Sequence, residues 1–450
     1  MHEEQLYRAA LNGDLETVSD LLAGGADPNA ISTGEDEGLP LCAAAAWDRV
    51  GVVGALLAAG ADVNGRESGG WHALLWAAAN GHAETAEALI EAGAQVDTPN
   101  DDGDTPLTLA TRRGALGVVR VLLEAGADAR KYDGDGDTPL DIAVDWVGVH
   151  LESALLDQIE QDGWDYIVGR QFAKDGTELV TVAGQSSEGE SEQVQAQRGH
   201  AAVATLLEEA TGAFTPVEQL VARAIAHRDT DEDAETWWIV ADALGKRGDE
   251  ETYDALAKLC VSEDAREREF GVDAISQFGF DEGAKPYLER TLPLLRRMAT
   301  TEGNPQVLRS VLAGLGHQGD RRALPEVLGI IGRAGHMRTM TDAIALADVL
   351  PPEHAEGLAL LIAMTVDEDE EVRDWATAGL AKLDADTPQI RDALAARLED
   401  GDLNTVAEAT RGLAERGDPR AEQGVKRVLA ESDDDYARDL VTEAATKLGT

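Results

Sequence analysis

The sequence has 450 residues, of which 43% are hydrophobic and 28% charged, an ordinary balance that excludes wholesale disorder and a membrane-embedded bundle. Lys and Arg total 38 against 86 for Asp and Glu, so the net charge is -48. This charge repels nucleic-acid phosphates and anionic lipid surfaces, and we expect neither a nucleic acid nor a membrane as a partner. Residues 1–212 carry -27 and residues 213–450 carry -21, so the acidity is not one patch.

The few residues with reactive side chains form no known chemical motif. Cys42 and Cys260 are far apart and lack the spacing of a zinc site or a redox dithiol. No metal-binding helix motif, nucleophile elbow or phosphate-binding loop is present. We therefore expect no cofactor, no metal and no enzymatic activity. The residues after Met1 lack the basic and apolar regions of a signal peptide, which favours a cytoplasmic location.

Short segments that combine Gly, Ala and Asp recur along the first part of the chain. The same alanine is found at Ala26, Ala61, Ala94 and Ala127, with spacings of 35, 33 and 33 residues. An apolar run typical of a helix precedes each segment, and a turn rich in Gly and Asp follows it. A period of this length predicts a stack of helical repeats.

Two of these turns contain the sequence DGDTPL, at Asp102–Leu107 and Asp135–Leu140. The hydroxyls of Thr105 and Thr138 are predicted to cap the next helix, and the proline after each threonine fits the first helical position. The glycine after each second helix suits the left-handed conformation that ends a helix. Each unit is therefore predicted to consist of a turn, two helices and a further turn.

These motifs resemble the ankyrin repeat, in which a Thr-Pro-Leu helix start is followed by a Gly-His pair and a Gly-Ala-Asp segment. Gly81-His82 and Gly114 match the position between the two helices, and Glu4–Asn29 resembles an amino-terminal capping repeat without its initial turn. The pair His72-Ala73 departs from the pattern by replacing Thr-Pro. The resemblance implies that His82 and His200 are structural residues rather than ligands.

The fifth unit is interrupted. Its helix start is at Thr138, but its Gly-His pair is found only at Gly199 and His200. Threonine and glycine are 61 residues apart here and nine apart in the previous unit, so about 52 residues are inserted, at about 147–197.

The insert is predicted to hold a helix at His150–Gln161, a β-hairpin around the Asp-Gly pair in Lys174–Thr177, and a disordered polar stretch, SSEGESEQVQAQ. An alternative gives the helix after His150 to the fifth repeat and leaves the helix after Gly199 outside the array. The ankyrin-like domain is predicted to span residues 1–212, interrupted by this insert.

From Thr215-Pro216 onward the period changes and only helical patterns remain, separated by short turns. The runs ALGKRGD, GLGHQGD and GLAERGD, which end at Asp249, Asp320 and Asp418, mark a second repeat. Residues 213–450 resemble HEAT-like repeats, the group that includes the lyase-type bacterial versions, and should form six or seven helix pairs. Five of the eight tryptophans are predicted to lie in the core, namely Trp76, Trp146, Trp237, Trp238 and Trp375.

The alternating acids Asp133, Asp135 and Asp137 resemble the opening of a calcium-binding loop. Glycine and glutamate are absent from its sixth and twelfth positions, where Thr138 and Val144 stand. The segment also lies where the resemblance places an ankyrin finger, so we interpret it as an ordinary finger turn.

The ankyrin resemblance implies a binding surface on the finger tips and on the helix ends before each inner glycine. The alternative for Trp47 and Trp71 is that they only fill gaps between repeats. The candidate partner-binding residues are Trp47, Trp71, Asn80, Asp101, Asp102, Asp104, Arg112, Arg113, Tyr132 and Asp137.

The fold class that follows is an all-α, two-part helical-repeat solenoid, an ankyrin array and then a HEAT-like array, with a small inserted β-hairpin. We expect a scaffold or adaptor that binds a protein partner on the ankyrin concave face and on the HEAT-like surface. Two alternatives stay open: an enzyme or lyase-like accessory with a site on the HEAT-like array, and an acidic decoy that neutralises a basic protein. A high-salt cytoplasm or a GC-rich genome explains the spread acidity more simply than a basic partner does.

Overall fold

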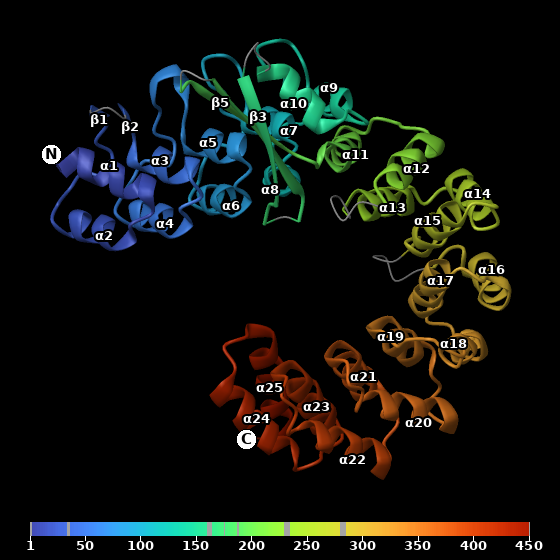
Figure 1. Cartoon of the computed structure of the whole chain (residues 1–450). Helices are drawn as coiled ribbons and strands as arrows, with labels where there is room; N and C mark the ends of the chain where they lie inside the picture. Colours follow the sequence, from blue (N-terminus) through green and yellow to red (C-terminus); the bar gives the residue numbers. More distant parts are fainter. Residues whose placement is uncertain are drawn as a thin grey trace. The chain divides into compact units, whose positions relative to one another are not determined.

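The computed structural model describes residues 2–33, 37–159, 164–174, 176–186, 189–228, 235–279 and 285–449. They form two compact units, Met1–Ala243 and Leu244–Thr450, coloured blue to green and green to red in Figure 1. This division lies later in the chain than the repeat boundary at 212/213, which remains a prediction.

The first unit consists of helix pairs in two layers. The first helices of the pairs stack on one another in chain order, and the second helices form a parallel row, as α1 to α6 show in Figure 1. The first helices are α1 (His2–Asn12), α3 (Pro40–Ala46), α5 (Ala73–Asn80), α7 (Pro106–Arg113) and α9 (Pro139–Trp146). The second helices are α2 (Leu15–Ala23), α4 (Val50–Ala58), α6 (Ala83–Glu91), α8 (Leu116–Glu124) and α11 (His200–Thr211).

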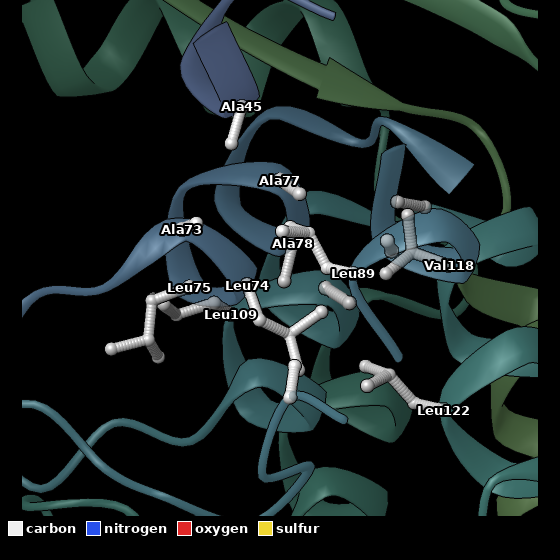
Figure 2. Close-up of a cluster of buried hydrophobic side chains, with 14 of the residues drawn as sticks. Ala45, Ala73, Leu74, Leu75, Ala77, Ala78, Leu89, Leu109, Val118 and Leu122 are labelled. Atoms are coloured by element: carbon white, nitrogen blue, oxygen red, sulfur yellow. The ribbon is translucent and has the colours of Figure 1, made fainter. Parts of the chain in front are cut away.

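The predicted helix starts are confirmed. Thr105 and Thr138 each form a capping box with the residue three positions later, and the proline after each begins α7 and α9. Between the layers, small and branched side chains such as Ala78, Leu89, Val118 and Leu122 are fully buried (Figure 2). Because each pair buries its apolar face only against its neighbours, the array is stable only as a stack.

The Gly-Ala-Asp segments hold consecutive repeats together. The side chain of Asn29 donates to the carbonyl of Gly60 (3.0 Å) and accepts from the backbone N–H of Asp62 (2.7 Å). Asn64 accepts from the N–H of Gln95 (2.9 Å), one repeat later. The recurring polar residue therefore forms a ladder between turns, which explains why it follows the period of the sequence.

The insert folds into one helix and a small sheet. Its antiparallel strands, in the order β3-β4-β5, pair Val168 with Val182 and Val182 with Val194. The bounds are α10 (Leu151–Ile159), β3 (Trp164–Phe172), β4 (Glu178–Ser186) and β5 (Ser191–Gln197). Leu155 of α10 packs on Val182 in a core that is separate from the ankyrin core.

The expected hairpin is present as strands β3 and β4, but one expectation about the insert is wrong. Most of the stretch predicted to be disordered forms strand β5, because Val194 and Ala196 alternate with glutamines and so have one apolar side to pack against α10. The inserted hairpin is therefore part of a three-stranded sheet, although residues 187–188 lie outside the described ones.

The alternative assignment of the fifth repeat is also wrong. Helix α11 packs against α8 and α9, as the second helix of a repeat must, whereas α10 packs against β4 and β5. The insert therefore separates the two helices of one repeat.

The first unit also contains shorter and later elements. A two-stranded bridge pairs Ser32 with Gly38, in a turn of which residues 34–36 lie outside the described part. Its strands are β1 (Ser32–Thr33) and β2 (Glu37–Gly38), and the remaining helices are η1 (Ser68–Gly70), α12 (Val217–Ala226) and α13 (Glu235–Arg247), the last of which crosses into the second unit.

The second unit repeats one packing rule. Helices α15, α17, α19, α21, α23 and α25 stack in order, and each packs on the helix before it. Six of the expected six or seven helix pairs therefore lie within its described residues. The bounds are α14 (Glu250–Leu259), α15 (Ala265–Ser276), α16 (Leu288–Thr301), α17 (Pro305–Gln318), η2 (Arg321–Ala323), α18 (Leu324–Ile331), α19 (Met340–Val349), α20 (Ala355–Met364), α21 (Glu370–Lys382), α22 (Pro388–Arg397), α23 (Leu403–Glu415), α24 (Ala421–Glu431) and α25 (Asp435–Leu448).

The recurring Gly-Leu and Gly-Asp pairs of this unit have separate structural roles. A Cβ on Gly412 would lie 2.7 Å from the Cβ of Ala381, so glycine is needed where stacked helices approach. Asp418 accepts from the N–H of Arg420 (3.0 Å) and begins the turn before α24.

The placement of tryptophans is partly wrong. Trp237 is 1% exposed, but its neighbour Trp238 is 50% exposed. Adjacent helical residues are about 100° apart around the axis, so both rings cannot face the core. Trp375 is 40% exposed for the same reason: its neighbour Ala376 lies on the buried face of the helix, so Trp375 cannot.

Candidate functional site

The finger tips of the fourth and fifth repeats are joined by Arg112. Its guanidinium lies 3.1 Å from a carboxylate oxygen of Asp104 and 2.8 Å from one of Asp133, whose side chain is buried. Asp133 also accepts from the backbone N–H groups of Asp135 (3.0 Å) and Asp137 (2.9 Å). The alternating acids therefore build a finger turn, as predicted, and the charge of Arg112 is neutralised within the protein.

Other side chains at the finger tips are exposed to solvent. The Tyr132 side chain is 64% exposed, and Asp102 and Asp137 are exposed without an ion pair among the described residues. Asp101 is exposed and pairs with Arg66 (3.2 Å). The finger edge thus presents one aromatic side chain beside several carboxylates.

The two tryptophans of the candidate surface have different environments. Trp71 is half-buried, and its ring centre lies 4.4 Å from that of Trp76, whose Nε1 donates to Glu67 (3.0 Å). Burial raises the pKa of Glu67. Trp47, at the end of α3, is 57% exposed. Trp71 thus fills a gap in the array, and Trp47 does not.

The insert covers the helix ends of the third and fourth repeats in the candidate surface. Arg113 donates to the backbone carbonyl (3.0 Å) and the side-chain oxygen (2.8 Å) of Gln195 in β5, and burial lowers the pKa of its guanidinium to about 10. Lys174, in the β3-β4 loop, lies 3.1 Å from Asp48 and 2.6 Å from Glu84, in the second and third repeats. The sheet therefore has α10 on one face and ankyrin helix ends on the other.

Asn80 lies beside this contact and lines a cavity of 360 Å³ between the third repeat and the hairpin. Its side-chain amide donates to the carbonyl of Trp76 (2.9 Å). The sequence analysis predicts Asn80 and Arg113 as contacts to a partner. It does not predict that Lys174 and Gln195 of the insert lie against this part of the ankyrin surface. The alternation of apolar and polar residues around Gln195 was the only signal for the strand that carries it.

The two histidines that follow an inner glycine are structural, as predicted. The ring of His82 contacts the carbonyl of Ala46 through Nε2 (3.1 Å), and the ring of His200 contacts that of Arg112 (3.3 Å). Each histidine thus ties the start of a second helix to the end of an earlier first helix.

The thiols of Cys42 and Cys260 are buried, one in each unit. Burial raises the pKa of Cys42 well above its usual range and raises the pKa of Cys260 to about 12. Because the thiolate is the reactive form, we expect neither thiol of the native chain to react with an aromatic disulfide reagent at pH 8, and both to react in denaturant. Absorbance of the released thiol measures this, and rapid reaction of the native chain would contradict the burial of either side chain.

Among the described residues of the second unit, a histidine–carboxylate contact lies beside a cavity of 330 Å³. Nε2 of His336 lies 2.6 Å from Asp342, which is fully buried. The other oxygen of Asp342 accepts from the N–H (2.8 Å) and hydroxyl (3.0 Å) of Thr339 at the start of α19. The contact between His336 and Asp342 is therefore part of a helix cap. The hydroxyl of Thr339 already donates to Asp342 in the same cap.

The described residues offer little further chemistry. No group of three or more His, Cys, Asp or Glu side chains within them is arranged to hold a metal ion. None of their helices is long and apolar enough to cross a membrane.

Comparisons with known families agree with this architecture. Models of ankyrin repeats match residues 6–100 and 89–143, and a model of HEAT repeats matches residues 357–446. No curated protein matches the chain. Repeats of both kinds are in general protein-interaction modules. These matches identify the chain as a fusion of ankyrin repeats with HEAT-like repeats.

Proposed function

We propose that this chain is a non-enzymatic scaffold that binds a protein partner on the open part of its ankyrin surface. The observation that carries the proposal is the finger edge, where Tyr132 stands exposed beside carboxylates that form no ion pair within the described part of the chain, on turns that hydrogen bonds hold rigid. Exposed aromatic side chains on a preorganised surface are typical anchors of protein interfaces, because little conformational freedom is lost on binding.

The candidate residues divide into two groups under this proposal. Trp47, Asp101, Asp102, Tyr132 and Asp137 are exposed and are proposed to touch the partner directly. The others are engaged within the chain and are proposed to hold the surface in shape: Trp71, Asn80, Asp104, Arg112 and Arg113.

The test compares the full chain with a Trp47→Ala, Tyr132→Ala double variant. Both are immobilised and exposed to lysate at low salt and at about 0.5 M salt, where charges more than a few ångströms apart are screened. We expect a partner that the wild type retains at both salt concentrations and that the double variant binds about 30-fold more weakly, the loss typical of an aromatic hot spot.

Leu15→Ala is the matched control, since Leu15 is 45% exposed on α2 in the row of second helices. It should leave retention unchanged. A different result would support the acidic-decoy function: the wild type loses the partner at high salt, and the wild type and the double variant retain it equally at low salt. Equal loss in the control and the double variant would contradict the finger edge as the binding surface.

A further inference from the structure

A second surface lies where the insert meets the ankyrin fingers. A cavity of 570 Å³ opens between α7 and α9 on one side and α10 and β5 on the other. The two sides belong to separate hydrophobic cores, so the cavity lies between two folded bodies rather than within one. Both bodies are part of the first unit.

The floor of this cavity is apolar. Leu109 and Ile142 contribute from the ankyrin helices, and Leu155 and Val194 from the insert. The half-buried Trp146 lies between them, with its ring centre 4.9 Å from that of His200. Such a floor suits the aliphatic part of a side chain.

The rim of the cavity has an excess of negative charge. Asp135, Asp137 and Asp145 line it, are exposed, and form no ion pair among the residues that the structure describes. The two arginines of the lining are already engaged, Arg112 by carboxylates and Arg113 by the oxygens of Gln195. Arg113 keeps its positive charge, because its partners are the uncharged oxygens of Gln195, but the three carboxylates outnumber it and the rim stays negative.

We propose that this cavity receives a lysine or arginine side chain from an extended basic segment of the partner protein. The aliphatic stem of such a side chain would cover the apolar floor while its charged end meets the three carboxylates. Charge complementarity identifies the occupant, because an acidic or neutral segment would leave the carboxylates desolvated without a counter-charge. This inference rests on the proposed function, since it names the chemistry of the partner.

The test uses a fluorescein-labelled GLKVRLG peptide and the full chain, with fluorescence anisotropy as the measurement. The site variant is Asp135→Asn, Asp137→Asn, Asp145→Asn. The control variant, Glu87→Gln, Glu91→Gln, Glu124→Gln, changes the net charge equally on α6 and α8, where these acids are exposed. At about 0.15 M salt we expect at least about tenfold weaker binding by the site variant and less than about twofold by the control.

A third variant addresses the shape of the cavity. Gln158 is exposed in α10 and lines the cavity, so Gln158→Arg places a guanidinium where the peptide side chain would lie. It should weaken peptide binding as much as the site variant does, while circular dichroism shows an unchanged helix content.

Several results would overturn the inference. Equal weakening in the site and control variants would mean that the peptide responds only to overall charge, and equal binding of a GLQVQLG peptide would mean that no cation is recognised. Displacement of the peptide by an equal concentration of spermidine would assign the cavity to a free amine. If the site variant binds the peptide normally while the Trp47, Tyr132 variant loses the partner, the scaffold function stands and the cavity is not its site. If the site variant loses the peptide while the Trp47, Tyr132 variant retains the partner, the cavity binds a basic segment but the proposed scaffold surface is wrong.

Discussion

Replacing Gly114 with alanine is expected to lower the free energy of unfolding of the first unit by about 3 kcal/mol or more, as the sum of backbone strain and overlap. Gly114 has a φ of 72°, where a side chain costs about 1 kcal/mol. A Cβ there would also overlap the carbonyl oxygen of Gln197 and lie 2.6 Å from Cε1 of His200. The carbonyl is backbone of the insert and cannot move unless β5 leaves the ankyrin surface.

The matched control for this prediction is Gly126→Ala. Gly126 has a φ of 83°, but no atom lies within 4 Å of the place that its Cβ would take, so only the strain of about 1 kcal/mol applies. Hydrogen exchange should show loss of protection in β5 for the Gly114 variant alone. Equal effects of the two substitutions would contradict the close seating of the insert.

The second large effect concerns the protonation of His200. Burial lowers the pKa of this imidazole to about 4, although its contact with the carbonyl of Arg112 opposes the shift. The unfolded chain binds the proton near its usual pKa of about 6.5, so the folded state binds fewer protons between these values. The contribution of His200 to stability is therefore complete above about pH 7 and is lost as the pH falls toward 4, by about 3 kcal/mol in total.

Denaturant unfolding at several pH values tests this expectation. His200→Gln should reduce the fall between about pH 6.5 and pH 4 by about 3 kcal/mol. His150→Gln, at an exposed position, is the matched control. Because other groups also titrate, the difference between each variant and the wild type is the informative quantity. An unchanged slope in His200→Gln would show that the imidazole is not buried in its neutral form.

Much of the fold is predictable because its signals are local and repeated. The capping threonines, the first-turn prolines and the polar ladder around Asn29 depend on residues within one repeat or the next. The helical pattern also continues through residues 244–279 and 285–356, before the match to the HEAT model begins, because small residues recur where stacked helices approach.

The candidate surface is less predictable, because it depends on where a distant segment lies. Nothing near Arg113 in the sequence indicates that Gln195 engages it, and nothing near Asp48 indicates the approach of Lys174. Arg112 looks like a free cation in the sequence, and only the folded turn shows that Asp133 is within 2.8 Å. Exposure of Trp47 and Tyr132 likewise follows from what the insert leaves uncovered.

The split fifth repeat determines the order in which the array can fold. Helix α7 ends at Arg113 and α8 begins at Leu116, whereas α9 ends at Trp146 and its companion α11 begins only at His200. Closing a flexible loop of that length costs about 2 to 3 kcal/mol more than closing a tight turn. In the folded chain the two ends lie together, as the stacked rings of Trp146 and His200 show. An insert that folded first would remove most of this loop-closure cost. We therefore expect the early repeats to assemble by local steps, the last one to be completed after the insert has folded, and the first unit to show a slow late phase in refolding.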